Sequence, residues 1–384
     1  MIPYGKQSIS DDDIAEVERI LRSDWLTQGP DIDAFEKSLA AYCGASQAVA
    51  VCNATAALHI ACLAVGLGPG DWLWTVPNTF VASANCGRYC GASVDFVDID
   101  PHTYNMSVDA LRSKLGQAAA EGRLPKVVIP VHFAGQSCDM VQIAALAGQY
   151  GFRVIEDASH AVGADYAGQK VGCGAHSDMT VFSFHPVKIM TTAEGGAVLT
   201  NDPLLAARLR GLRSHGITRD PVLMSGEIEG PWYYEQHGLG FNYRITDIQA
   251  ALGSSQLRRL DIFLERRRAL ARRYDALLAD LPVVIPLQAG YGRSSFHLYP
   301  IQLTDAAGAP RRAVFEGMRE RGVGVNVHYI PVHLQPYYRD LGFTSGMFPV
   351  AENYYRRAIS LPLYYGLTDA EQDQVVQALR DSLP

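Results

Sequence analysis

Short apolar runs alternate with helix-like segments through the first half of the chain. The runs are rich in β-branched residues and occupy positions 48–52, 72–76, 94–97, 127–131 and 153–157, while the segment 56–65 has the composition of a helix. Continuous apolar strands that alternate with helices predict a mostly parallel sheet with helices on both faces. Two later runs, 180–184 and 196–200, predict a hairpin-like pair on the same sheet.

The chain begins with a lead, residues 1–30, that contains one predicted helix. Ser10 precedes three aspartates, which is the pattern of an N-cap followed by an acidic first turn. Ile14, Val17 and Ile20 then follow at helical spacing, with Leu21 beside the last of them. We therefore expect a helix directly after Ser10.

The pattern changes near residue 247. A long charged helix is predicted from there through Arg258, Arg266 and Arg273, followed by strands at 296–301 and 323–327 and helices at 311–321 and 369–379. We therefore expect a large domain of residues 1–250 and a small α+β domain of residues 251–384. The loop 221–238 is rich in glycine, proline and aromatic residues, which predicts a mobile segment or a cover over a site.

Composition narrows the function classes. The 384 residues are 48% hydrophobic and 19% charged, which is typical of a globular protein, and the formal net charge of −7 disfavours nucleic-acid binding. No stretch approaches the roughly 18 apolar residues of a membrane helix, and the N-terminus has no signal-peptide pattern. The seven scattered cysteines, with Cys86 and Cys90 lacking a second pair, predict reduced thiols, no metal site and a cytoplasmic location.

A strand-end acid and a lysine in a turn are the candidate chemistry. Asp157 ends the apolar run 153–157, and Lys188 lies in a segment rich in glycine and threonine between two predicted strands. Pyridoxal phosphate (PLP) needs such a pair, because an amine forms a Schiff base with its aldehyde and a carboxylate keeps its pyridine nitrogen protonated. A surface lysine and a strand-end aspartate in an ordinary loop would show the same spacing, so spacing alone leaves both interpretations open.

Longer motifs occur in order along almost the whole chain. They are residues 53–59, 77–85, 131–136, 156–161, 183–188, 194–196 and 240–250. Through these motifs the chain resembles the DegT/DnrJ/EryC1/StrS family of sugar aminotransferases. The resemblance implies an α/β, type I PLP-dependent fold like that of aspartate aminotransferase. It also implies a homodimer and amino transfer from L-glutamate to a keto sugar nucleotide, with the pyridoxamine form of the cofactor as intermediate.

Segments 26–29, 191–196, 213–216 and 327–333 are most similar to the C4 aminotransferases of the pseudaminic acid pathway. The resemblance then implies a UDP-linked 4-keto-6-deoxy-N-acetyl-L-hexosamine as substrate. Two alternatives stay open: another nucleotide-sugar aminotransferase, such as one acting on C3 of a dTDP-3-keto sugar, and an inactive aminotransferase-like regulator. The presence of Lys188, Asp157, Thr55 and Ser183 argues against the inactive regulator.

The resemblance assigns roles around the PLP ring. Lys188 is the residue expected to hold PLP and then to move the proton of the reacting carbon, whereas the related sugar dehydratases carry histidine there. Asp157 is expected at the pyridine nitrogen. His160 is expected near the ring or its phenolic oxygen, with a structural role as the alternative. Phe80 is expected to stack on the ring, although a core phenylalanine would look the same in the sequence.

The phosphate of PLP is expected at the start of the helix that follows Cys52. Its first N–H groups lack partners within the helix and its dipole favours an anion. The predicted phosphate ligands are the N–H groups of Ala54, Thr55 and Ala56, the hydroxyls of Thr55 and Ser183, and, through the resemblance, Asn242 of the other subunit.

The resemblance also places residues around the sugar nucleotide. They are Tyr4, Asp24, Trp25, Leu26, Thr27, His328, Tyr329 and Ile330. Arg244 is a candidate phosphate clamp, with a surface or interface ion pair as the alternative. His132 and Gln136 are expected to line the region near the cofactor.

Overall fold

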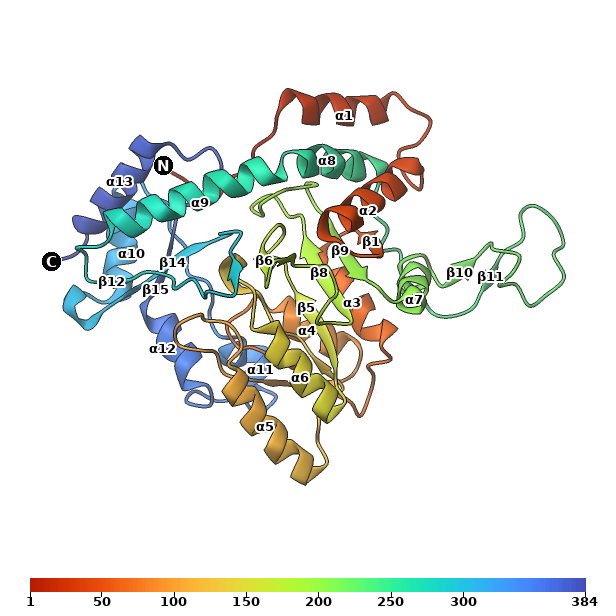
Figure 1. Ribbon diagram of the computed structural model, residues 1–384, viewed down its shortest axis with the longest axis horizontal. Helices are drawn as coiled ribbons and strands as arrows, with labels where there is room; N and C mark the ends of the chain where they lie inside the picture. Colours follow the sequence, from red (N-terminus) through yellow and green to blue (C-terminus); the bar gives the residue numbers. More distant parts are fainter.

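A seven-stranded sheet forms the centre of the molecule (Figure 1). The computed structural model describes residues 1–384. The strands, in spatial order, are β1 (Gln47–Val51), β9 (Gly196–Thr200), β8 (Met179–Ser183), β5 (Arg153–Asp157), β4 (Val127–Val128), β2 (Trp72–Thr75) and β3 (Ser93–Phe96). The pairs from β8 to β3 are parallel, whereas β9 is antiparallel to both β1 and β8. The mostly parallel sheet and its antiparallel hairpin-like pair confirm the prediction.

Alternate residues of the strands enter two different cores, so both faces of the sheet are covered. In β1, Val49 and Val51 join one hydrophobic cluster, while Ala48 and Ala50 join another. The first cluster also contains residues of α3 (Ala54–Ala64), α4 (Ala82–Tyr89), α5 (Val108–Glu121), α6 (Met140–Tyr150) and α7 (Pro203–Arg213). The second contains residues of α2 (Pro30–Cys43), α8 (Asp247–Arg258) and α9 (Leu260–Leu277). Successive side chains of a strand therefore pack against helices on opposite faces of the sheet.

The predicted N-terminal helix is α1 (Asp11–Leu21), and it packs along α8 (Figure 1). Ser10 and Asp13 form a capping box, in which each side chain accepts a hydrogen bond from the other residue's backbone N–H. The buried carboxylate of Asp13 also accepts hydrogen bonds from Gln256 and Arg259. These bonds fasten the lead to the helices that continue into the C-terminal part.

A third core holds the C-terminal elements. Its residues run from Leu270 to Leu379 and lie in or beside β12 (Val283–Val284), β14 (Tyr299–Leu303), β15 (Ala358–Leu361), α10 (Arg311–Glu320) and α13 (Asp369–Arg380). The other elements of this part are η2 (Asp305–Ala307), η3 (Val332–Leu334), α11 (Pro336–Arg339) and α12 (Pro349–Arg357). The small sheet pairs β12, β14 and β15. The division into domains at residue 250 stays a prediction.

Two expected elements differ from the structure. The single long helix is two helices, because the backbone of Arg259 leaves the helical geometry between α8 and α9. The predicted strand 323–327 is wrong. There Val323 makes an isolated bridge with Ile2 and Asn326 one with Ser360, so different neighbours share the segment and no continuous ladder forms.

The segment 217–239 projects from the body of the molecule as an arm, seen at the side of α7 in Figure 1. Its base is the two-stranded pair β10 (Ile217–Thr218) and β11 (Glu235–Gln236). Its apolar side chains Val222, Trp232 and Leu239 are exposed. The arm lines no part of this chain's own large cavity, so it does not cover that site within one chain.

The remaining elements are small. A three-stranded sheet pairs β13 (Gly292–Arg293), β6 (Asp165–Tyr166) and β7 (Gln169–Lys170), and a short 3-10 helix, η1, covers Phe133–Gly135. None of the helices combines the length and the hydropathy that a membrane span requires.

Candidate active site

One large cavity, of about 1020 Å³, lies at the carboxyl ends of β5 and β8 and at the start of α3. Carboxyl ends of parallel strands are where open α/β sheets bind ligands. The cavity is lined by many of the residues that the sequence singled out: Tyr4, Ala54, Thr55, Ala56, Phe80, Asp157, His160, Ser183, Lys188, His328, Tyr329 and Ile330. Residues from the N-terminal lead, from the C-terminal part and from the central sheet therefore meet in one place.

Asp157 is the last residue of β5, and two donors contact its side chain. It is 5% exposed, and its side chain accepts hydrogen bonds from the hydroxyl of Ser83 (2.6 Å) and from the backbone N–H of Ser159 (3.1 Å). The Ser83 hydroxyl lies 2.8 Å from that of Thr79. Sequence reasoning did not identify Ser83, although it lies within the motif 77–85 that carried the family resemblance.

Lys188 lies in the turn between β8 and β9, in surroundings that disfavour the charged form of its amine. Desolvation lowers the pKa of Lys188 to about 8, although the nearby carboxylate of Asp157 acts in the opposite direction. Thr191 holds the turn through a hydrogen bond from its hydroxyl to the carbonyl of Phe184 (2.9 Å). A lysine with a lowered pKa in a cavity is suited to attack an aldehyde near neutral pH.

The start of α3 forms an anion site with one fewer donor than predicted. Asn53 caps the helix by accepting a hydrogen bond from the N–H of Ala56 (2.8 Å), so that N–H is not free, contrary to the sequence prediction. The N–H groups of Ala54 and Thr55 have no partner in the chain, and neither do the hydroxyls of Thr55 and Ser183. These groups and the helix dipole together suit a phosphate.

Gly196 explains how the anion site approaches the sheet. A Cβ atom at this position would lie 2.7 Å from the backbone nitrogen of Ala54 and 2.7 Å from the carbonyl carbon of Asn53. Such contacts are far inside van der Waals distance with backbone atoms that cannot move aside. Only glycine therefore lets the start of α3 lie against β9.

Histidine and tyrosine side chains form one wall of the cavity. The hydroxyl of Tyr329 lies 3.1 Å from Nε2 of His160, and the ring of His328 lies 5.7 Å from that of Tyr4. Burial lowers the pKa of His160, and burial together with Lys188 lowers the pKa of His328 to about 3. Burial raises the pKa of the Tyr329 hydroxyl. The wall is therefore neutral, with Lys188 as the cation beside it.

Phe80 is not a core residue. Its side chain is 59% exposed at the cavity, 6.5 Å from the ring of Tyr329 between centroids. An exposed phenylalanine in a cavity wall is available to stack on a planar ligand, as the sequence interpretation requires.

Six predicted site residues lie outside this chain's cavity. They are Asp24, Trp25, Leu26, Thr27, Asn242 and Arg244. Trp25 and Leu26 are about half exposed, and Asn242 lies on the surface, where its backbone pairs with that of Ser214. Arg244 makes no ion pair within the chain, so the surface ion pair is absent here, and an interface ion pair and a phosphate clamp both stay predictions.

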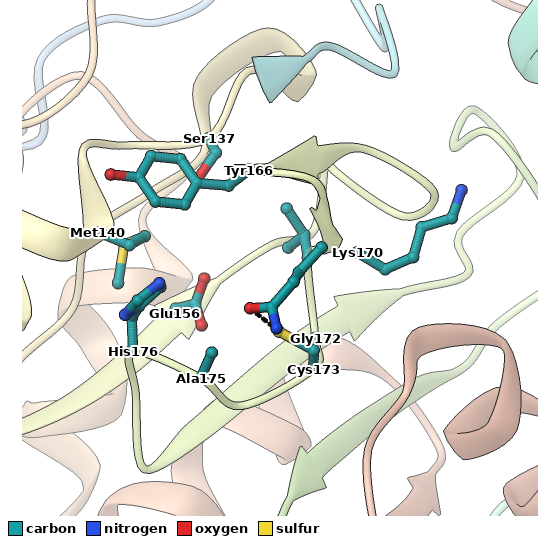
Figure 2. A pocket seen from close by; sticks show the side chains of 11 residues that line it. Ser137, Met140, Glu156, Tyr166, Lys170, Gly172, Cys173, Ala175 and His176 are labelled. Carbon is teal, nitrogen blue, oxygen red and sulfur yellow. Dashed lines mark hydrogen bonds between the residues drawn. The ribbon is translucent and has the colours of Figure 1, made fainter. Parts of the chain in front are cut away.

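The expected lining by His132 and Gln136 is wrong. Adjacent residues of a strand point to opposite faces, and on β5 Asp157 faces the large cavity whereas Glu156 lies behind it. His132 is buried there, with Nε2 2.6 Å from the Glu156 carboxylate. Figure 2 shows Glu156 beside a second, small cavity of about 20 Å³, which has room for about one water molecule.

The structure adds lining residues that the sequence did not reveal. They are Asn53, Leu58, His59, Thr79, Val81, Ala82, Tyr89, Val131, Ser159, His185, Val187, Glu194, Tyr243, His297, Asn326, Val327 and Gln335. Some belong to the motifs 53–59 and 77–85, which are thus signals that sequence reasoning could have used. His297 and Asn326 lie in the C-terminal part, outside every motif, and only the fold brings them here.

Comparison with known proteins agrees with this geometry. The DegT/DnrJ/EryC1/StrS aminotransferase family model matches residues 7–380. The spore coat polysaccharide biosynthesis protein SpsC of Bacillus subtilis is 41% identical over 99% of this chain and 96% of its own length. PseC of Helicobacter pylori, an aminotransferase involved in the biosynthesis of pseudoaminic acid, superposes with a TM-score of 0.91 at 29% identity, over 100% of this chain and 99% of PseC.

Spr1654 of Streptococcus pneumoniae has been solved in a PLP form and in a PMP form. The PMP form superposes with a TM-score of 0.90 at 31% identity, over 100% of this chain and 99% of that one. The donor set here fits PLP: an amine of lowered pKa, a buried carboxylate and free donors at a helix start lie around one cavity. The site, the fold and the full-length matches agree, and the chain belongs to the DegT/DnrJ/EryC1/StrS family of PLP-dependent sugar aminotransferases.

Proposed function

We propose that the protein transfers the amino group of L-glutamate to C4 of a UDP-linked 4-keto-6-deoxy-N-acetyl-L-hexosamine, the transamination that forms UDP-4-amino-4,6-dideoxy-N-acetyl-β-L-altrosamine for pseudaminic acid. The observation that carries the proposal is the likeness to PseC over the whole chain, at a TM-score of 0.91. The segments 26–29, 191–196, 213–216 and 327–333 add support from the sequence.

A second candidate is amino transfer to a different sugar nucleotide. The identity with SpsC, a spore coat polysaccharide protein, is 41%, which is higher than the 29% identity with PseC. Both candidates use the same Lys188 and Asp157 and differ in which sugar the cavity accepts. A C3 aminotransferase of a dTDP-3-keto sugar belongs to this second candidate.

The chain's own residues have separate tasks in the proposed reaction. Bound PLP would supply the carrier for the amino group between glutamate and the sugar ketone. Lys188 holds the cofactor and, once released, its amine moves a proton to and from the reacting carbon. The carboxylate of Asp157 keeps the pyridine nitrogen protonated, and the donors of Thr55 and Ser183 hold the phosphate. His160 would lie beside the ring of the bound cofactor, and Phe80 would stack on one face of it.

We further propose that the active site is shared between two copies of the chain. Both substrates are anionic, yet no arginine lines the cavity, and Lys188 is its one lysine. Arg244 is without an ion pair, and Asn242 lies near it on an exposed segment. A partner subunit that contributes these two residues, together with its residues 24–27, would supply the missing charge and polar groups.

Substrate specificity is tested with a panel of UDP-linked 4-keto and dTDP-linked 3-keto sugars and L-glutamate, with products identified by mass spectrometry and NMR. We expect amination at C4 of the UDP-linked N-acetylhexosamine. Amination only of another sugar would support the second candidate, and amination of none would overturn the catalytic proposal.

The shared site is tested by mixing two inactive variants, Lys188→Ala and Asn242→Ala, after unfolding and refolding them together. If each site takes Lys188 from one chain and Asn242 from the other, a mixed dimer carries one intact site and activity returns. Each variant refolded alone is the control. A mixture as inactive as the single variants would contradict a site built from both chains.

A further inference from the structure

The segment 294–297 of the C-terminal part is pressed against the cavity wall in a strained conformation. Phe296 has a φ of +49°, in the left-handed region that a bulky residue rarely adopts. Ser295 is fully buried, and its hydroxyl donates a hydrogen bond to the backbone carbonyl of His160 (2.8 Å). Its backbone N–H donates to the carbonyl of Gly135 (3.0 Å). Strain of this kind persists only where neighbouring contacts hold it in place.

Gly135 is needed for this close approach. It has a φ of +101°, and a Cβ atom there would lie 2.4 Å from the Ser295 hydroxyl oxygen and 2.9 Å from the backbone nitrogen of Phe296. Within the motif 131–136, Gly135 therefore serves the segment 294–297, while Val131 lines the cavity.

A buried arginine holds the other side of the segment. Arg267 on α9 is 2% exposed and has no carboxylate partner. Its Nη1 lies 3.2 Å from the carbonyl of Phe296, 3.3 Å from that of His297 and 2.9 Å from that of Leu363. Burying an unpaired guanidinium is unfavourable, so its hydrogen bonds to these carbonyls are what keep it there.

These contacts fix the position of the His297 ring. The imidazole of His297 lies 4.4 Å from that of His160 between centroids, and both rings are buried. The Nδ1 atoms of both rings have no hydrogen-bond partner, so no hydrogen bond fixes either ring at that atom. The His160 ring is therefore held at Nε2 by the hydroxyl of Tyr329 and on one side by packing against His297.

We propose that His297, anchored by Arg267, is a positioning residue that fixes the ring of His160 and, through it, the hydroxyl of Tyr329 in the cavity wall beside Lys188. The effect on turnover rests on the proposed function. The positions of the two rings do not, because they are a property of the protein without ligands. Burial and nearby cations lower the pKa of His297 as well, so the packed pair of rings is neutral.

The first test is an NMR measurement on the cofactor-free protein labelled with [13Cε1]-histidine, with the His160 signal assigned through His160→Gln. We expect His297→Ala to shift and broaden the His160 signal and to let it titrate between pH 5 and 7, which the wild-type signal does not. His102→Ala, which removes an exposed histidine, is the matched control and leaves the signal unchanged. A His160 signal with the same shift, width and titration in His297→Ala overturns the proposal.

A second variant acts from a distance. Arg267→Lys keeps the charge but ends one bond short of the Nη1 position on which the three carbonyls converge, so it is expected to disturb the His160 signal in the same direction. Arg272→Lys, on the exposed side of α9, is expected to leave the signal unchanged. In turnover with the accepted sugar nucleotide, both His297→Ala and Arg267→Lys are expected to lower kcat about tenfold or more with little change in KM.

The two kinds of failure are distinguishable. An altered His160 signal in a protein that aminates no sugar would overturn the proposed function and support the positioning role. Normal turnover with an unchanged His160 signal in both variants would overturn the positioning role and leave the proposed function standing.

Discussion

Lys188 is expected to destabilise the cofactor-free protein, and the structure gives the size of the effect. An ordinary lysine has a pKa of 10.5, and desolvation lowers that of Lys188 to about 8. Between these values the unfolded chain binds more protons than the folded one, so the free energy of unfolding rises as the pH increases from about 8 to 10.5. The full difference in pKa corresponds to about 3 kcal/mol. Because the amine of Lys188 faces the cavity, solvent screens part of this cost, and we expect the charged amine to lower the free energy of unfolding by about 2 kcal/mol.

The assay is urea unfolding of the cofactor-free wild type and of Lys188→Met, at equal protein concentration, at pH 7 and at pH 10. Methionine is unbranched like lysine, is one atom shorter, and removes the charge. The variant is expected to be more stable by about 2 kcal/mol at pH 7, and its advantage should shrink towards zero at pH 10.

The matched control is Lys37→Met, which removes an exposed lysine from α2. Its unfolding free energy is expected to stay within about 0.5 kcal/mol of the wild type at both pH values. The reasoning is refuted if the difference in unfolding free energy between Lys188→Met and the wild type is the same at pH 7 and pH 10. It is also refuted if Lys188→Met is less stable than the wild type at pH 7.

Three further predictions concern the cofactor cradle. Asn53→Ala removes the cap of α3 and is expected to lower the free energy of unfolding by about 1 kcal/mol, measured by urea unfolding, with a parallel loss of PLP affinity. Gly196→Ala places a Cβ 2.7 Å from backbone atoms and is expected to destabilise by about 1–3 kcal/mol and to weaken PLP binding; unchanged PLP affinity in equilibrium dialysis would show that the start of α3 does not bind the phosphate. Ser83→Ala removes a donor from the buried carboxylate of Asp157 and is expected to destabilise by about 1–3 kcal/mol, while Ser38→Ala on the exposed face of α2 is the control; equal melting curves for the two variants would contradict the role given to Ser83.

Local patterns were enough to predict the large α/β part. Strands such as β1 and β5 are continuous apolar runs because helices cover both faces, and that burial is visible in the sequence itself. The run of β5 ends at Asp157 and that of β8 ends shortly before Lys188, so the chemistry could be located at strand ends before any contact was known. The N-cap at Ser10 was equally readable, because a capping box is made by residues three positions apart.

Two of the errors involve contacts between segments far apart in the chain, and one is local. Residues 323–327 have the composition of a strand, but Ile2 and Ser360 each pair with a different part of them. The sequence predicts a free N–H at Ala56, because the direction of the Asn53 side chain cannot be read from its position alone, whereas in the structure that N–H donates to Asn53. His132 was placed at the cavity, although its ring binds Glu156 behind the sheet.

The amino-acid sequence by itself determined the alternation of strands and helices, the lysine and carboxylate that suit PLP, and the family, because each is written in residues close together along the chain. Tertiary structure alone decided the contacts around the site. Ser83 donates to Asp157, His297 packs against His160, and Arg267 donates to the carbonyl of His297. Those contacts join residues far apart in the chain, and no local pattern encodes them. The packing of three cores against one another sets which side chains meet.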